Sequence, residues 1–345
     1  MIPLFAVAAI AGLAISTMVT WLIARNAYKV GLIDVPNQRS SHLAATPRGG
    51  GLGIVAGVAT GMLVFAAAGH PPSRELGLLT IAAAAVATLG AVDDLRSVPA
   101  HLRFLGQLAV AIAIVIALGT VGRLPLPKPL DLPLGWVAWP FTVLWLMGVT
   151  NFYNFMDGID GLAGGQSVAS CVGIAVAGWA LGSVEFAVVL ASSSIGFLLL
   201  NRPPARIFLG DVGSTSVGFA IAATPLLAPV EERPMALLAV ALGLSLFLLD
   251  PLETLARLLL SGRRLGAAHR LHSYQRIATS RRRAIWTTTY ILCCGLCLSL
   301  GGGLSYRIPW LTWPLIAAAL CAYAAERFIA DSPRSSGPVT GVTKT

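Results

Sequence analysis

The sequence predicts an all-α membrane protein, a polytopic bundle of about eleven transmembrane helices. Its 345 residues are 56% hydrophobic and 11% charged, whereas an ordinary soluble chain is about 25% charged. The mean hydropathy is +0.78. Apolar runs close to the length that crosses a bilayer, about 20 residues, recur along the chain. These observations exclude a water-soluble fold.

The apolar runs define the expected helices in chain order. The first run, 2–24, has no basic residue before it and Arg25 and Lys29 after it, which favours a retained anchor over a cleaved signal peptide. The other runs lie near 50–69, 76–92, 104–122, 135–150, 164–182, 184–200, 213–229, 235–256, 284–303 and 309–329. A single span around Gly182 and Ser183 would reduce the count to ten. Residues 1–330 are expected to form one membrane domain, followed by a disordered tail at 331–345.

The basic residues predict the orientation of the bundle. Of the 24 Lys and Arg residues, 19 lie in the tail or in connections that follow odd-numbered runs. The positive-inside rule therefore puts the N-terminus outside and the C-terminus in the cytoplasm. This topology accounts for the net charge of +9, and a nucleic-acid groove is not expected because the basic residues are strung between apolar runs.

Five acidic residues fall where predicted helices end at the cytoplasmic face. They come from the segments LGAVDDLRS, NFYNFMDGIDGL and FLGDVGS, and are Asp93, Asp94, Asp157, Asp160 and Asp211. Clustered carboxylates repel one another unless a cation compensates them. Because Mg²⁺ takes a few carboxylate oxygens and completes its shell with water and phosphates, the cluster indicates a metal-bound pyrophosphate in a cytoplasmic cleft. The simpler alternative is solvated loop charges paired with Arg96, Arg202 and Arg206.

In NFYNFMDGIDGL, four polar residues recur every three positions: Asn151, Asn154, Asp157 and Asp160. If the segment is helical, their side chains share one broad face that could hold a nucleoside by hydrogen bonds. The alternative is a helix end that Asn and Asp cap, with Gly158 and Gly161 as helix breakers.

The last cytoplasmic loop, SGRRLGAAHRLHSYQRIATSRRR, contains seven Arg with His269 and His272. Guanidinium and imidazole groups suit phosphate oxygens. We expect the two His, with Arg264 and the earlier Arg48, to bind substrate. The alternative for this loop is a purely topological basic segment that contacts anionic lipid, and we assign the run 281–283 to that role.

Two further segments are unusual for membrane helices. PRGGGLGI at 47–54 contains a glycine pattern, but it opens a membrane span and does not follow a strand, so a dinucleotide fold is not expected. Its glycines should instead allow close backbone approach. Asp250 and Glu253 lie in or at the end of the ninth run and, with Pro251, indicate a broken helix near the site.

Taken together, these motifs resemble the polyprenyl-phosphate N-acetylaminosugar-1-phosphate transferases, the glycosyltransferase family 4 membrane enzymes. The resemblance runs from about Asp34 to Ile277 and rests on PNxRxxH, the glycine run, the Asp pair, NxxNxxDGxDGL and FLGDxGS in the family's order. It implies a UDP-linked N-acetyl sugar as donor, undecaprenyl phosphate as acceptor, Mg²⁺ (or Mn²⁺) as cofactor, and a bacterial inner-membrane enzyme with its active site facing the cytoplasm. It leaves a homodimer open.

The resemblance also implies roles for individual residues. Asp211 matches the magnesium ligand of the FLGD motif. Asp93 and Asp94 match an aspartate pair that acts as a base or supports the metal, and we place Asp94 beside Asp211 as a ligand. The nucleoside-binding positions are Asn151, Asn154, Asp157, Asp160 and Phe208.

The late histidine segment, AHRLHSYQRI, departs most from the family's better-known members. It looks like the subgroup that initiates O-antigen synthesis on UDP-N-acetylglucosamine, UDP-N-acetylfucosamine or UDP-N-acetylquinovosamine. A phospho-MurNAc-pentapeptide transferase of peptidoglycan synthesis is the alternative. A secondary transporter is a remote one, because its acids should lie near mid-membrane in two repeats, not at one face.

Overall fold

The computed structural model describes residues 2–35, 45–124, 126, 129–261, 272–278 and 280–332. The helices follow one another as α1 (Ile2–Val30), α2 (Gly51–Ala67), α3 (Arg74–Arg96), α4 (Ala100–Leu118), α5 (Ala138–Met156), α6 (Leu162–Ala177), α7 (Leu181–Asn201), α8 (Gly210–Ala223), α9 (Arg233–Gly243), α10 (Ser245–Leu260), α11 (Ser273–Ile277), α12 (Arg281–Arg307) and α13 (Thr312–Asp331). Four short 3₁₀ segments, Gly135–Val137, Thr224–Leu227, Val230–Glu232 and Pro309–Leu311, lie between them. A small antiparallel pair, β1 (Ile33–Asp34) and β2 (Thr46–Pro47), joins α1 to α2.

The all-α prediction is confirmed, and each predicted apolar run coincides with a helix or a helix pair. Within the described residues, six helices are long and apolar enough to cross a membrane, or seven if one bent pair counts as a span. The helices α2 and α6 are apolar but shorter. The chain is therefore a multi-pass membrane protein, while the count of about eleven spans stays a prediction.

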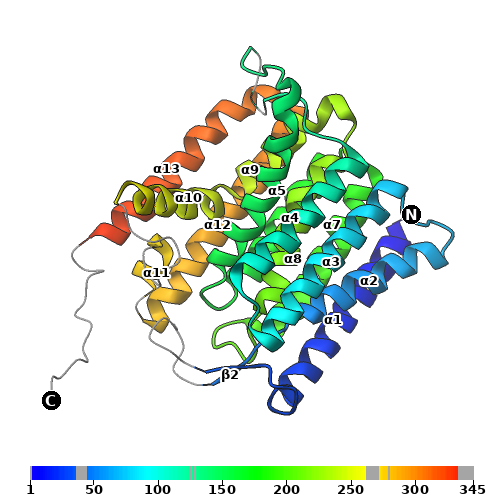
Figure 1. The fold of residues 1–345 in the computed structure, drawn as a ribbon, viewed down its shortest axis with the longest axis vertical. Helices are drawn as coiled ribbons and strands as arrows, with labels where there is room; N and C mark the ends of the chain where they lie inside the picture. Colours follow the sequence, from blue (N-terminus) through cyan, green and yellow to red (C-terminus); the bar gives the residue numbers. More distant parts are fainter. Residues whose placement is uncertain are drawn as a thin grey trace.

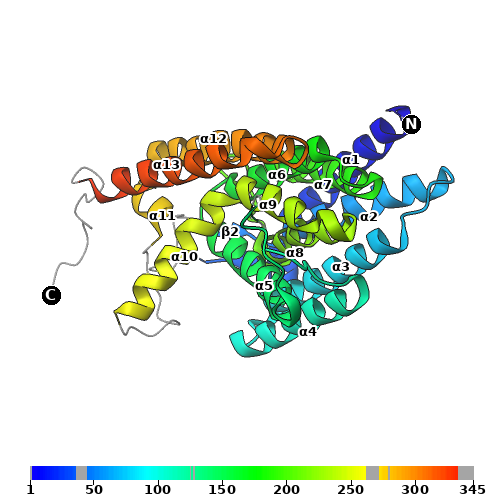
Figure 2. The same ribbon diagram turned by 90° about the horizontal axis from the view of Figure 1, so that it is seen from above.

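Helix α8 lies at the centre of the bundle (Figure 2). Every residue from Val212 to Ala223 is buried, and the helix packs against α3, α5, α2 and α6. Its sequence, GDVGSTSVGFAIAA, is rich in Gly, Ser, Thr and Ala, and such small residues let neighbouring helices approach closely. The central helix thus holds the first residue after its N-terminal glycine, Asp211, inside a packed frame.

The connections gather at two ends of the bundle. Among the described connections, those after the first, fifth and seventh predicted runs meet near β2: the Phe208 N–H donates to the Pro47 carbonyl at 2.8 Å, and Gly161 N–H to the Asn201 side chain at 2.9 Å (Figure 1). After even-numbered runs, they meet at the other end, where the Trp179 indole donates to the Thr224 carbonyl at 3.2 Å. This grouping agrees with a chain that crosses the membrane repeatedly.

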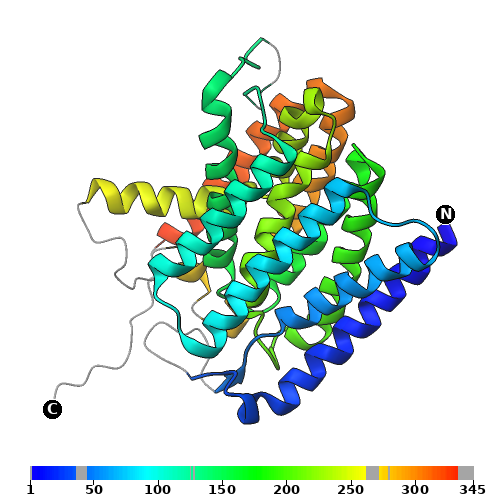
Figure 3. The same cartoon turned by 45° about the vertical axis from the view of Figure 1, so that its right-hand side comes forward.

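The ninth predicted run is bent. Helices α9 and α10 meet at Leu244 at an angle of 79°, and α10 extends out of the bundle (Figures 2 and 3). The sequence predicted a broken helix here, but the break precedes Pro251, which lies inside α10. Beyond the bend, Asp250 of α10 accepts a hydrogen bond from the N–H of Ser273, the first residue of α11.

Candidate active site

Backbone hydrogen bonds hold the FLGD segment against the start of α2. Gly50 N–H donates to the Phe208 carbonyl at 2.9 Å, and Gly51 N–H to the Leu209 carbonyl at 2.8 Å. A Cβ atom on Gly51 would lie 2.2 Å from the Cα of Gly213, so only glycine permits this approach. The glycine run therefore packs α2 against the start of α8, as the sequence suggested.

Asp94 caps this same helix start. Its side chain is almost completely buried, and its Oδ1 and Oδ2 accept hydrogen bonds from the N–H groups of Asp211 and Val212 at 3.1 and 3.0 Å. These are N–H groups that a helix leaves without partners at its beginning, and the helix dipole favours a carboxylate there. Gly210 has φ +75°, and a Cβ on it would meet Asp94 Oδ2 at 2.6 Å, so the first position of α8 also needs glycine.

Arg48 approaches Asp94 from β2. Its guanidinium donates to the Asp94 main-chain carbonyl, and its Nε lies 3.9 Å from Asp94 Oδ1. The Arg48 side chain is 30% exposed, so part of it remains accessible from outside the bundle. Arg48 thus links the residues after β2 to the Asp pair on α3.

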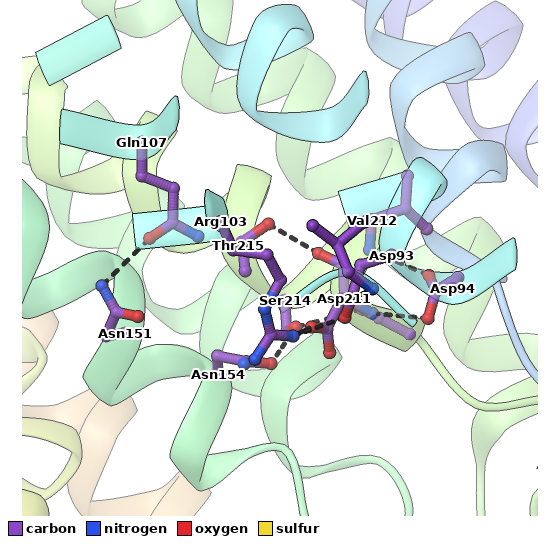
Figure 4. A network of polar contacts seen from close by, with 12 residues as sticks. Asp93, Asp94, Arg103, Gln107, Asn151, Asn154, Asp211, Val212, Ser214 and Thr215 are labelled. Carbon is purple, nitrogen blue, oxygen red and sulfur yellow. Dashed lines mark hydrogen bonds and ion pairs between the residues drawn. The ribbon is translucent and has the colours of Figure 1, made fainter. Parts of the chain in front are cut away.

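Asp93 and Asp211 converge on one guanidinium nitrogen. Nη1 of Arg103, from the first turn of α4, donates to Oδ2 of both carboxylates (Figure 4). Asp93 Oδ1 also accepts from the Val98 N–H at 2.6 Å. The side chains of Asp211 and Arg103 are 25% and 33% exposed, so the cluster is open at the end of the bundle.

The end of α5 lies beside this cluster. Asn154 Oδ1 accepts from the Ser214 hydroxyl of α8, and the Asn151 amide donates to Gln107 Oε1 of α4 at 3.1 Å (Figure 4). Asn151 and Asn154 therefore lie on α5 and contact the elements that carry Arg103 and Asp211.

The other two members of the predicted polar face lie beyond the helix. Helix α5 ends at Met156, Asp157 is its C-terminal cap, and α6 starts after Gly161, whose φ is +77°. The single helical face is thus wrong for Asp157 and Asp160, and the alternative of a helix end with glycine breakers describes the backbone. The reason is that Gly158 and Gly161 favour a turn, so the helix ends at Met156, before the third and fourth polar residues.

The charges of neighbouring carboxylates affect the pKa of Asp157. Burial raises the pKa of its carboxyl well above the ordinary value, and the negative charges of Asp211, Asp94 and Asp160 raise it further. A cation near these carboxylates would oppose that rise. The charges of carboxylates from two other connections thus act on Asp157.

Asp160 organises the loop that leads to Phe208. Its Oδ2 accepts from the Ala205 N–H at 2.9 Å, and its carbonyl accepts from the Thr288 hydroxyl at 3.3 Å. Buried Asn201 joins the same two loops, because it accepts from Gly161 N–H and donates to the Ile207 carbonyl at 2.8 Å. Phe208 is half-buried at the end of this loop.

His272 lies against the end of α5. Its ring centroid is 6.2 Å from that of Phe155, and the hydroxyl of Tyr274, two residues later, donates to the Phe155 carbonyl at 2.7 Å. Arg264 and His269 lie outside the described residues. The structure thus brings one of the two predicted histidines next to the Asn154 segment.

Sequence reasoning missed three side chains of the site: Arg103, Asn201 and Ser214. The simpler alternative paired the acids with Arg96, Arg202 and Arg206, whereas the structure pairs Asp93 and Asp211 with Arg103. The sequence contained a signal for Arg103, because this residue lies in the first turn of the helix that directly follows the Asp pair. Asn201 and Ser214 are polar residues in or at the end of apolar runs. Polar residues at such positions usually form specific hydrogen bonds or take part in function.

A cationic group compensates the two carboxylates. Arg103 places its positive charge at the point where one oxygen of Asp93 and one oxygen of Asp211 meet. Among the described residues, no group of three or more His, Cys, Asp and Glu side chains is arranged to hold a metal. A magnesium ion at such a site takes one or two carboxylates and fills its shell with water and substrate phosphates.

Comparison with known proteins identifies the family to which the chain is related. The model for glycosyl transferase family 4 matches residues 76–228, which include the Asp pair, the α5 end and Asp211. A probable undecaprenyl-phosphate N-acetylglucosaminyl 1-phosphate transferase of Bacillus subtilis (strain 168) is 35% identical over 278 residues, which are 79% of this chain and 76% of the relative.

Two other relatives have comparable coverage. A decaprenyl-phosphate N-acetylglucosaminephosphotransferase of Mycobacterium leprae (strain TN) is 30% identical over 314 residues, 79% of this chain and 77% of the relative. A phospho-N-acetylmuramoyl-pentapeptide-transferase of Desulforamulus reducens is 30% identical over 298 residues, 79% of this chain and 86% of the relative. The protein therefore belongs to the polyprenyl-phosphate aminosugar-1-phosphate transferase superfamily, within glycosyl transferase family 4.

Proposed function

We propose that the protein transfers an N-acetylaminosugar-1-phosphate from a UDP-sugar to undecaprenyl phosphate and releases UMP. The observation that carries this proposal is the convergence of Asp93 and Asp211 on Arg103 at one open end of a membrane bundle. A cation-compensated carboxylate pair suits a pyrophosphate, and a lipid acceptor in the bilayer can reach only a site at such an end.

Asp211 and Asp93 would hold Mg²⁺, or Mn²⁺ in its place, because their oxygens already meet at a cationic group. The metal ion, when bound, neutralises negative charge on the donor pyrophosphate as UMP leaves. Asp94, which the sequence placed among the ligands, has both oxygens on the N–H groups of α8. Its contribution in this proposal is to fix the backbone of Asp211.

The chain's own residues would bind and orient the two substrates. Asn151, Asn154 and the 157–160 loop form the nucleoside side, with Phe208 beside the base at the end of the neighbouring loop. Arg48 and His272, with Arg264 and His269, would contact phosphate oxygens. An acceptor phosphate is already ionised at neutral pH, so positioning and charge neutralisation account for the reaction without a strong base.

We infer the orientation and the pathway from charge and from the late histidine segment. The basic connections belong on the cytoplasmic side, which puts the site at the cytoplasmic face of the bacterial inner membrane. The segment AHRLHSYQRI favours UDP-N-acetylglucosamine, UDP-N-acetylfucosamine or UDP-N-acetylquinovosamine as donor. The product would then start a lipid-linked, O-antigen-like polysaccharide of the cell envelope.

A phospho-N-acetylmuramoyl-pentapeptide transferase is the second candidate, because the relative from Desulforamulus reducens has that name and is matched over 86% of its length. A transporter is less well supported, since the carboxylates lie at one end of the helices.

The deciding experiment uses the purified full-length protein with undecaprenyl phosphate and a panel of UDP-sugars, with UMP release as the readout. We expect release with one or more of the three UDP-N-acetyl sugars, and its loss on chelation of divalent cations. Brisk release with UDP-MurNAc-pentapeptide would establish the second candidate. No release with any donor would refute the proposed function.

A further inference from the structure

Asp250 is a buried carboxylate outside the acid cluster. It lies in α10, beyond the 79° bend, and is 1% exposed. A carboxylate in such a place costs free energy unless it forms hydrogen bonds or pairs with a cation. Its contacts therefore indicate what it does.

The contacts of Asp250 lead to α11. Its Oδ1 accepts from the Ser273 N–H at 2.9 Å and is approached by the Thr254 hydroxyl at 3.5 Å. Ser273 is the first residue of α11, so the bond fixes where this short helix begins. On the other side, Arg327 of α13 donates to the Ser273 hydroxyl at 3.2 Å.

The residue immediately before α11 is His272, and its Nδ1 lies 3.8 Å from Asp250 Oδ1. Within the described part of the chain, this Nδ1 and Asp250 Oδ2 are both buried and lack a hydrogen-bond partner. Buried polar atoms in native proteins are normally paired, and a hydrogen bond to the neighbouring Asp250 carboxylate would give His272 Nδ1 the partner that it lacks. Such a bond from Nδ1 to a carboxylate fixes the tautomer and leaves Nε2 free to face a ligand.

His272 is also fixed relative to the acid cluster. Its ring packs against Phe155 on α5, which follows Asn154 directly, and Tyr274 bonds to the Phe155 carbonyl. A residue that orients the imidazole therefore orients it beside the end of α5, which the proposed function assigns to the donor.

We propose that Asp250 is a positioning residue for the transfer reaction: its buried carboxylate docks α11 and orients the His272 imidazole toward the phosphates of the donor. This inference rests on the proposed function for its catalytic consequence, but not for the docking of α11.

The first test measures docking without turnover. A single cysteine replaces Gln275 of α11 in purified full-length protein from which the five native cysteines have been removed. The labelling rate with a water-soluble maleimide should rise at least about tenfold when Asp250→Ala is added, because a lost hydrogen bond to a charged group weakens docking by roughly that factor. Asp250→Asn, which keeps an oxygen acceptor for the Ser273 N–H, should give a smaller rise.

The second test measures UMP release by Asp250→Ala, His272→Ala and the double variant. Asp250→Ala should lower kcat by about tenfold or more, and the double variant should be no slower than His272→Ala within about twofold, because coupled residues are not additive. Glu185→Gln is the matched control: Glu185 is a buried acid of α7 with no bond to α11, and its effect should simply multiply with that of His272→Ala.

The two tests separate the possible failures. Unchanged labelling in Asp250→Ala, or losses that multiply in the double variant, would overturn the positioning role. If neither the unmodified protein nor any variant releases UMP, but Asp250→Ala still speeds the labelling of the cysteine at position 275, the proposed function is refuted. The docking of α11 by Asp250 is then still supported.

Discussion

At the residue scale, the site depends on which charged atoms share a partner. Asp93 and Asp211 share Arg103, while Asp94 binds the start of α8 with both of its oxygens. Neighbouring residues of one DD pair thus have different surroundings, and substitutions at the two positions should differ in kind.

Asp211→Asn should remove nearly all UMP release while the protein still inserts and folds. The amide keeps the shape of the side chain but loses the charge that holds a divalent cation. Activity and thermal unfolding of the purified variant are the measurements. Near-normal turnover would contradict the assignment of Asp211 to the metal.

Asp94→Asn should act mainly on stability. An amide can accept only one of the two N–H bonds that Asp94 now receives and adds an N–H group facing the other, so a buried donor loses its partner at a cost of about 1–3 kcal/mol. We expect a lower unfolding temperature in detergent than for Asp93→Asn, whose carboxylate is less buried. Equal unfolding temperatures would argue against the capping role.

His272→Ala should lower turnover with UDP-N-acetyl sugars by about tenfold to a hundredfold. This is the rate equivalent of one charge-assisted hydrogen bond to phosphate that tightens in the transition state. Steady-state UMP release measures it. An unchanged rate would return His272 to a structural role in packing against Phe155.

At the element scale, the site is built on the close packing of α2, α3 and α8. Small residues allow this packing. Helix α8 is buried along its length, so Asp211 has a fixed position relative to the Asp pair on α3. A larger side chain at a helix contact should therefore disturb the site from a distance.

Gly51→Ala should destabilise the protein by about 1–3 kcal/mol, because the new Cβ would lie 2.2 Å from the Cα of Gly213 and backbone must move. Thermal unfolding in detergent is the measurement. Gly148→Ala in α5 is the matched control, since nothing lies within 4 Å of a Cβ built there. If both variants unfold at the same temperature, the close contact of α2 with α8 does not limit stability.

At the scale of the whole molecule, the two groups of connections imply opposite sides of a membrane. Ser97 follows the Asp pair at the site end, and Ser73 caps the start of α3 at the other end. The basic residues concentrate in the connections that follow odd-numbered predicted runs, which include Ser97. The direction of insertion thus decides which compartment supplies the donor.

In a cysteine-free background, Ser97→Cys should be protected from an impermeant thiol reagent in intact cells, whereas Ser73→Cys should be labelled. The physical reason is that loops rich in Lys and Arg stay in the cytoplasm. Permeabilised cells, in which both should react, are the control. The reverse labelling pattern would place the site outside the cell.

The sequence by itself determined the fold class, the approximate positions of the apolar helices and the segments proposed to carry the site. These properties are local: hydrophobicity, glycine and clustered acids act within a run of neighbouring residues. Only the tertiary structure decided that Arg103 joins Asp93 to Asp211, which follows Arg103 by 108 residues in the chain, and that Asp94 caps α8. It also located the bend at Leu244 and placed His272 between Asp250 and Phe155. Such pairings depend on how buried surfaces of distant helices fit together, and no pattern within one segment contains that information.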